Sequence, residues 1–456
     1  MDFSKEERMG NAPLGRLMLS LSLPSIIAQV INILYNIVDR IFIGHISGVG
    51  ATALTGVGLT FPILMLVTAF SAFSATGGAA LASMQLGRGN REKAEKILGS
   101  CVWLLILSTI FLMVVFYLFH IPFLFMFGAS EHTISYASEY LRIYLAGTIF
   151  VELALGLNSF IIVQGRPGIA MCSILIGAII NVILDPILIF GLNMGVSGAA
   201  VATVFSQLIS ALWNVCFLCG KHSSLKIRRA YICYEKPILI RILSLGISPF
   251  VMKSTECLIQ IVMNRQLQIY GGDLYVGSMA IMQSVMTLMS APITGFTQGV
   301  SPVVSYNFGA NNFPRVRKTY RSMIVICLCC SFLATSTEIF FPGFYARLFT
   351  SDAELIQIIT HVMPIFVFGM LIFGIQDGVQ NTFLALGQAK ISLFIAMMRK
   401  VVLLVPLALI LPTRFGIMGV YYAEPISDIL SVTIAFSLFA FNIKKILSQN
   451  TLDHLT

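Results

Sequence analysis

The sequence predicts an all-α integral membrane protein with twelve transmembrane helices in two six-helix lobes. Three observations predict this fold: the composition is 57% hydrophobic and only 11% charged, long segments lack charge, and the two halves resemble each other. Soluble globular proteins carry roughly 25% charged residues. Each uncharged segment is longer than the roughly 20 residues that cross a bilayer as a helix. These segments are 41–87, 97–130, 186–220 and 274–314.

Twelve apolar segments predict the individual helices. The first is too long for the apolar core of a cleavable signal peptide, so we expect it to be retained as a signal anchor. Proline inside several segments is compatible with membrane helices, because neighbouring helices can satisfy the freed backbone groups. In chain order the segments are 17–44, 52–82, 97–119, 134–162, 169–190, 197–219, 239–269, 276–304, 319–342, 355–385, 391–411 and 417–441.

The distribution of Lys and Arg predicts the orientation in the membrane. With the N-terminus inside, most basic residues fall on the inner side, including Arg399 and Lys400 in the sixth inner loop. The outer side carries Arg40, Arg142, Arg265, Arg347 and Arg414, and Lys253 is the main cation inside a helix. The positive-inside rule then places both termini in the cytoplasm of a multi-pass protein of the plasma membrane. The basic excess therefore reflects topology, and we expect no nucleic-acid partner.

An internal repeat divides the chain into two halves. At one constant offset Gly87 aligns with Gly309, Asn90 with Asn312, and Gly165 with Gly387, and near the same offset GVSGAA (195–200) aligns with GIMGVY (416–421). The repeat predicts an N-terminal lobe over 1–219 and a C-terminal lobe over 238–456, joined by a cytoplasmic linker over 220–237. Because each half has six helices, an even number, both halves begin on the same side of the membrane. We therefore expect parallel lobes, related by a pseudo-two-fold axis along the membrane normal, with a substrate cavity between them.

Acidic residues inside the predicted helices are the candidates for function. An ionisable side chain at mid-bilayer costs roughly 2.5–3.5 kcal/mol on insertion scales. Burial without a cationic partner favours proton uptake by a carboxylate, so a cluster of such acids can bind H⁺ or Na⁺ and attract a cationic substrate. For Glu152, Glu424 and Asp428 taken singly, hydrogen bonding between helices or an interfacial position is favoured. The functional candidates are Asp39, Asp185, Glu256 and Asp377.

The segment NVILDP in the fifth helix has the most specific chemistry. Asn181 and Asp185 are four residues apart and so share one helix face. Pro186 has no N–H and leaves a backbone carbonyl one turn earlier without its helical partner. An acid, an amide oxygen and a free carbonyl can therefore converge on one cation. Tyr35 and Asp39 show the same spacing in the first helix.

The acids of the second half allow two interpretations. Lys253 lies three residues before Glu256 on the same helix face. Glu256 is therefore either neutralised in an ion pair or available as a ligand of substrate or ion. The candidate acids do not follow the repeat, which favours separate roles in the two halves.

Several motifs together resemble the multidrug and toxic compound extrusion (MATE) family of transporters. The resemblance covers nearly the whole chain. It rests on LPSIIAQVINILYNIVDRIFIG (23–44), GRGNREKA (87–94), QGRPG (164–168), NVILDPILIFGLNMGVSGAAVATVFSQ (181–207) and FGIQDGVQNTFLALGQAK (373–390). It implies a multidrug antiporter that works by alternating access and exports amphipathic, cationic drugs or toxic organic cations in exchange for H⁺ or Na⁺.

The resemblance also implies roles for particular residues. An N-lobe cation site falls on Asp39, Asn181, Asp185 and Thr203, where Na⁺ is possible in place of a proton. A second ion or substrate site falls on Glu256 and Asp377, and Tyr35 belongs with the substrate or second-site residues. Since this chain carries both sets, the resemblance leaves the coupling ion open. It implies a monomer in the lipid bilayer that needs no cofactor and no bound metal.

Other function classes fit the sequence less well. A flippase for lipid-linked saccharides would keep the fold, but a cavity for lipid phosphates would be lined by Arg or Lys, and the candidates here are mostly acidic. An intramembrane enzyme or a sensor would need a catalytic constellation or an added soluble domain. The sequence contains no GxSxG, HExxH or Walker A motif, and the linker over 220–237 is too short for a domain.

Overall fold

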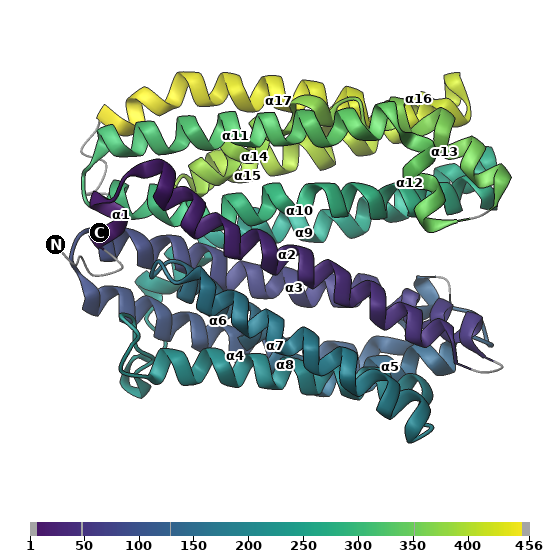
Figure 1. The fold of residues 1–456 in the computed structure, drawn as a ribbon, viewed down its shortest axis with the longest axis horizontal. Helices are drawn as coiled ribbons and strands as arrows, with labels where there is room; N and C mark the ends of the chain where they lie inside the picture. The colour runs from purple at the N-terminus through teal and green to yellow at the C-terminus, as the bar shows by residue number, and fades with distance from the viewer. Residues whose placement is uncertain (1–6, 47–48, 128, 351, 449–456) are drawn as a thin grey trace.

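The computed structural model describes residues 7–46, 49–127, 129–350 and 352–448. Its long helices lie side by side along one axis, and helix α1 (Glu7–Asn11) lies at the same end as the last turns of α17 (Figure 1). Within the described residues, ten helices are long and apolar enough to cross a membrane, and the count is twelve when each of two bent helix pairs is one span. The predicted all-α membrane fold with twelve helices is confirmed.

The first six spans follow the predicted order closely. They are α2 (Leu14–Gly44), α3 (Gly50–Gly87), α4 (Arg91–Met126), the bent pair α5 (Ile134–Ala146) and α6 (Thr148–Ile162), α7 (Pro167–Pro186) continued by the π-helical segment η1 (Ile187–Gly191), and α8 (Gly195–Cys219).

The other six spans belong to the second half. They are α9 (Lys236–Gly271), α10 (Asp273–Gly309), α11 (Phe313–Phe340), the bent pair α13 (Ala353–Phe366) and α14 (Met370–Ala385), α15 (Ala389–Met397) continued by the π-helical segment η3 (Met398–Leu404) and α16 (Val405–Phe415), and α17 (Ile417–Ser448). The short helix α12 (Pro342–Phe349) precedes α13 and has no counterpart among the predicted segments.

The backbone repeats where the sequence repeats. Asn90 caps α4 by accepting from the Lys93 N–H, and Asn312 caps α11 by accepting from the Arg315 N–H; such caps satisfy N–H groups that have no partner inside the helix. Both halves also place residues with positive φ at equivalent turns, in the pairs Gly89 and Asn311, Gly165 and Gly387, and Gly195 and Gly416. The sequence repeat therefore corresponds to turns with the same backbone geometry in both halves.

Each half bends its fourth span at the same place. Helices α5 and α6 meet at 57° around Gly147, and α13 and α14 meet at 53° just before Met370. Both parts of each bent span stay packed, since α5 contacts α3, α4 and α8, and α13 contacts α10, α12 and α17. Equivalent bends are expected if both halves descend from one six-helix unit.

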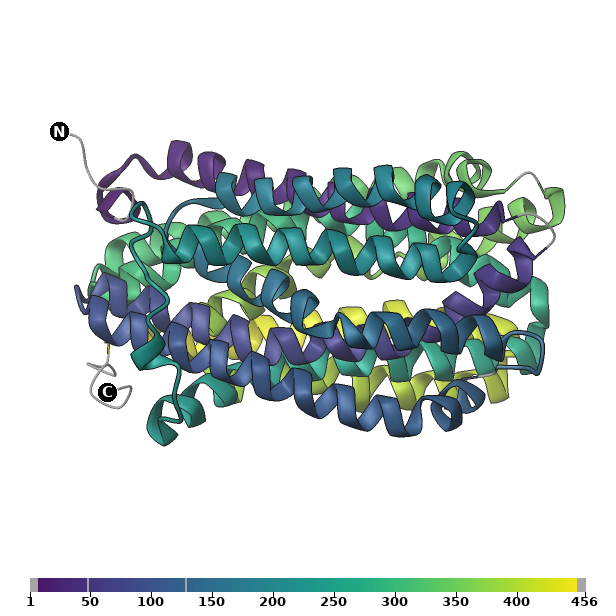
Figure 2. The same cartoon turned by 90° about the horizontal axis from the view of Figure 1, so that it is seen from below.

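The helices form two lobes that meet along four central helices. Helices α4–α8 gather in the lower part of Figure 1 and α11–α17 in the upper part, while α2 and α3 pack against α10 and α9 between them. Viewed from below, the purple-to-teal helices of the N-terminal half lie in front of the green and yellow ones (Figure 2). The exact lobe boundaries, 1–219 and 238–456, stay a prediction.

Glycines allow the central helices to approach each other closely. A Cβ atom on Gly246 of α9 would lie 1.7 Å from the carbonyl oxygen of Phe73 on α3. A Cβ atom on Gly299 of α10 would lie 2.6 Å from the carbonyl oxygen of Leu21 on α2. Membrane helices often use small residues in this way to bring their backbones together.

The segment between the lobes is fastened to the N-terminal lobe. The Gln164 side-chain oxygen accepts from the backbone N–H groups of Ser224 and Leu225 at 2.8 and 3.1 Å. Arg228 forms an ion pair of 2.6 Å with Glu95 of α4, which is almost fully buried. The predicted linker is therefore an ordered segment that packs along the N-terminal lobe.

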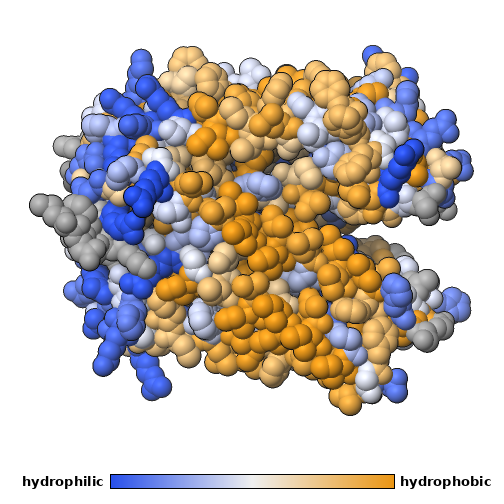
Figure 3. Space-filling view, viewed as in Figure 1, coloured by the Kyte–Doolittle hydropathy of each residue, from blue (hydrophilic) through white to orange (hydrophobic). Residues whose placement is uncertain are grey.

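The surface shows where a membrane would surround the protein. Apolar side chains cover the middle of the molecule, and hydrophilic side chains gather at its two ends (Figure 3). At the end away from α1 the surface is hollowed by a notch between the two lobes. The notch gives the interior between the lobes access to one side of the membrane.

Candidate functional site

The structure brings the predicted N-lobe residues together. Asn181 and Asp185 on α7 are both buried, and the Asn181 amide donates to one Asp185 carboxylate oxygen at 3.3 Å. Asp39 on α2 lies close enough for its charge to act on Asp185 and on Tyr35. Because Pro186 ends the regular part of α7, the site lies at the junction with η1, where the backbone widens.

Three oxygen atoms in this cluster have no hydrogen-bond partner within the described residues. They are Oδ1 of Asp39, Oδ1 of Asn181 and Oδ2 of Asp185. A buried polar atom without a partner costs about 1–3 kcal/mol. Because the three oxygens are on two neighbouring helices that pack together, one oxygen-loving cation could bind them together, whereas a proton on one carboxylate would be donated to one other oxygen.

Thr203, the remaining candidate for the N-lobe cation site, is linked to the cluster through Tyr140. Thr203 on α8 lies within hydrogen-bonding reach of Tyr140, a buried tyrosine of α5 on which the charge of Asp39 also acts. Tyr140 stacks on Tyr144 with ring centroids 6.3 Å apart. The structure thus adds Tyr140 to the cluster, and no sequence signal pointed to it, because α5 reaches the site only through the tertiary fold.

No cluster of three or more His, Cys, Asp or Glu side chains able to hold a metal ion occurs in the described part of the chain. The N-lobe cluster instead combines two carboxylates with an amide. This donor set fits a proton or a monovalent cation.

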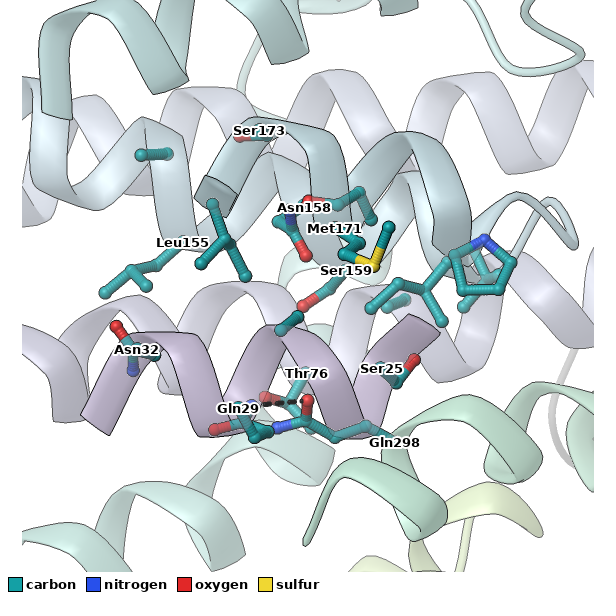
Figure 4. A pocket seen from close by; sticks show the side chains of 18 of the residues that line it. Ser25, Gln29, Asn32, Thr76, Leu155, Asn158, Ser159, Met171, Ser173 and Gln298 are labelled. Atoms are coloured by element: carbon teal, nitrogen blue, oxygen red, sulfur yellow. Dashed lines mark hydrogen bonds between the residues drawn. The ribbon is translucent and has the colours of Figure 1, made fainter. Parts of the chain in front are cut away.

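A cavity of about 230 Å³ adjoins the cluster. It lies between α2, α6, α7 and α8 of the N-terminal half and α10 and α14 of the other half, and Tyr35 is part of its wall. The residues that line it include no charged side chain. In Figure 4, Gln29 and Gln298 form a hydrogen bond of 2.8 Å at one wall of the cavity, which links the two halves.

A groove of about 300 Å³ lies on the other side of Tyr35, between α2 and α7. Apart from Tyr35, its walls are apolar side chains, among them Leu34, Ile179 and Ile183, which are about half exposed. Tyr35 and Ala178 line both spaces. Tyr35 therefore lies between an interior cavity of mixed polar and apolar lining and an apolar outer groove.

The second-half acids lie in a network with two buried cations. Arg399 donates to Glu424 at 3.1 Å and to Asp428 at 2.8 Å, and Lys400 donates to Glu256 at 2.8 Å. Both cations are on η3, so two consecutive residues reach two different neighbouring helices, α17 and α9. Asp377 on α14 lies close enough for both cations to act on it.

Two predictions about these cations are wrong. Arg399 and Lys400 do not lie in an inner loop, because the span from Ala389 to Phe415 contains both and buries Lys400. Lys253 is not the main buried cation: it is partly exposed and has no ion pair among those found in the described residues. Carboxylates on neighbouring helices neutralise the charges of Arg399 and Lys400. Counting charges along one segment of the sequence does not reveal these partners.

Comparison with known proteins identifies the family. The sequence profile of the MatE family matches residues 24–187 and 250–410. The chain belongs to the MATE family. The two matched stretches correspond to the two halves of the repeat.

Curated relatives of this MATE protein have similar length. The multidrug export protein MepA of Staphylococcus haemolyticus is 27% identical over 426 residues, which cover 92% of this chain and 93% of the relative. MepA of Staphylococcus aureus (strain MSSA476) is 25% identical over 425 residues and covers 93% of both chains.

Solved MATE structures share the whole fold. A MATE protein in complex with MaL6 superposes with a TM-score of 0.91 at 21% identity, covering 98% of this chain and all of that one. A multidrug resistance MATE transporter in an outward-facing conformation gives a TM-score of 0.88 at 22% identity, with coverage of 98% and 100%. At these identities the structures support the two-lobed fold.

Proposed function

We propose that this chain is a multidrug efflux antiporter of the plasma membrane, which exports amphipathic cationic compounds in exchange for H⁺ or Na⁺. The observation that carries the proposal is the N-lobe cluster, in which three buried oxygens of Asp39, Asn181 and Asp185 have no partner within the described residues. A site that is incomplete without a cation suits an ion that must bind and leave. Its relatives named as multidrug export proteins agree with this role.

The shape of the protein fits transport by alternating access. The notch between the lobes opens away from α1 (Figure 3), which is the outer side in the predicted orientation. The uncharged cavity beside Tyr35 would accept the body of an amphipathic compound, while the carboxylates nearby would attract its positive charge. The same carboxylates would hold the coupling ion once the compound has left.

The buried cations Arg399 and Lys400 do not favour the alternative function, a flippase for lipid-linked saccharides. Arg399 and Lys400 would be the natural ligands of a lipid phosphate, but both are already bound to carboxylates. The export of cations therefore remains the favoured function.

Efflux of a fluorescent cation from cells lacking their own pumps tests the proposal. Asp39→Asn and Asp185→Asn should each reduce efflux at least tenfold, whereas Glu354→Gln, which changes an exposed acid at the start of α13, should pump like the wild type. Vesicle assays with separate pH and Na⁺ gradients then identify the ion. Wild-type efflux by both Asn variants would refute the proposed mechanism.

A further inference from the structure

The two ion-pair systems of the second half differ in their accessibility. The Arg399 side chain is 14% exposed, and its partners Glu424 and Asp428 are 10% and 0% exposed. Arg399 also packs on the ring of Phe373, with its guanidinium carbon 4.2 Å from the ring centroid. Protein atoms therefore cover most of the surface of all three side chains. Arg399 therefore joins η3 to α17 through buried ion pairs.

The pair of Lys400 and Glu256 is open on one side. The Lys400 side chain is only 6% exposed, but that of Glu256 is 48% exposed. Glu256 is an exposed residue of α9, so part of its carboxylate is not covered by protein. Lys400 approaches from the protein interior, and the free side of the carboxylate faces accessible space.

Lys400 can give up Glu256 without losing every partner. Its ammonium group also donates to the backbone carbonyl oxygen of Met252 at 3.1 Å. Met252 lies one helical turn before Glu256 on α9, so a small shift of the lysine keeps the carbonyl contact. The ammonium would then remain hydrogen-bonded inside the lobe while the carboxylate binds something else.

We propose that Lys400 is a tethered counter-cation, which competes with cationic substrates for Glu256 and thereby limits how tightly the second half holds them. The inference rests on the proposed export of cations and adds the residue that sets their affinity. The favoured ligands are bulky monocations with delocalised charge. Such ions lose little hydration free energy on entering the cleft, whereas small, strongly hydrated ions lose much more.

The competition follows from the charges around Glu256. With Lys400 in place, the Glu256 carboxylate is already neutralised, and the charge of Lys253 acts on it as well. An incoming cation must displace the Lys400 ammonium group, which lies 2.8 Å from the Glu256 carboxylate and is part of the protein itself. Removing the lysine charge leaves Glu256 available, so affinity should rise and release should slow. An exporter gains from the wild-type arrangement, because a substrate held too tightly is not released.

Binding of tetraphenylphosphonium to the purified full-length protein in lipid nanodiscs tests the proposal. Lys400→Met should bind the probe about tenfold more tightly than the wild type, and Lys400→Arg, which keeps the charge, should restore an affinity close to the wild type. Lys390→Met is the matched control, because Lys390 is an exposed lysine at the start of the same span and should change nothing.

The double variant Lys400→Met, Glu256→Gln decides the mechanism. Its affinity should fall to that of Glu256→Gln alone, because the gain requires the carboxylate. An unchanged affinity in Lys400→Met, or a gain that persists without Glu256, would overturn the inference. If the wild type exports no cation in the efflux assay, the proposed function fails instead, so the two failures are distinguishable.

Discussion

Gly87 and Gly309 occupy equivalent positions in the two halves, and each packs against the helix that carries the other. A Cβ atom on Gly87 would lie 1.9 Å from the carbonyl oxygen of Tyr306 on α10, and one on Gly309 would lie 2.0 Å from that of Met84 on α3. The contact is reciprocal and lies near α1, at the end of the protein opposite the notch. The lobes are therefore joined where α3 and α10 end.

Adding a methyl group at this crossing should loosen the junction. Gly87→Ala and Gly309→Ala should each lower the free energy of unfolding by about 1–3 kcal/mol, since overpacking a close contact forces backbone shifts. Thermal unfolding of the purified protein measures the effect. Gly58→Ala on the same helix α3 is the control, because a Cβ there meets no atom within 4 Å. Equal melting temperatures for all three variants would contradict the close contact.

Loss of the Arg399 charge should destabilise the second half strongly. Arg399→Met leaves the buried carboxylates of Glu424 and Asp428 without their cation, and breaking a buried pair from one side costs about 3–5 kcal/mol. We expect low yields of folded protein and a lower melting temperature. Combining Arg399→Met with Glu424→Gln and Asp428→Asn should recover part of the stability, and failure to recover any would argue against a charge effect.

The Asn181 amide should tune ion affinity with little effect on folding. Asn181→Ala removes one unpaired oxygen and a weak donor to Asp185, so the ion gradient needed for half-maximal efflux should rise several-fold. Asn214 on α8 is a matched buried amide that donates to the Ala154 carbonyl and also has an unpaired oxygen. Asn214→Ala should leave the ion dependence unchanged. A similar shift in both variants would mean that the amide acts only through packing.

Tyr35 should act as a barrier between the inner cavity and the apolar groove outside. Tyr35→Ala joins the two spaces, so apolar compounds dissolved in the membrane should reach the cavity through the groove. Tyr35→Phe keeps the ring and should keep the two spaces apart. Labelling of the cavity by a membrane-dissolved apolar photoprobe measures both variants, and equal labelling of Tyr35→Ala and the wild type would rule out the barrier.

Local patterns in the sequence were sufficient to predict the fold and the first cluster. The shared helix face of Asn181 and Asp185 follows from helix geometry, and the repeat aligned Gly165 with Gly387, which have equivalent backbone geometry in the structure. What escaped prediction depends on contacts between distant segments. Tyr140 reaches Asp39 only because α5 packs beside α8, and Lys400 meets Glu256 only because η3 packs against α9.

In the proposed mechanism, an ion held by the unpartnered oxygens of Asp39, Asn181 and Asp185 would also be a folding ligand of the N-terminal half. A ligand that binds only the folded protein raises its stability in proportion to the logarithm of its concentration. The ion gradient that drives transport would then also set how long the pump survives in the membrane. A cell whose gradient collapses would lose the driving force first and the pump molecules themselves afterwards.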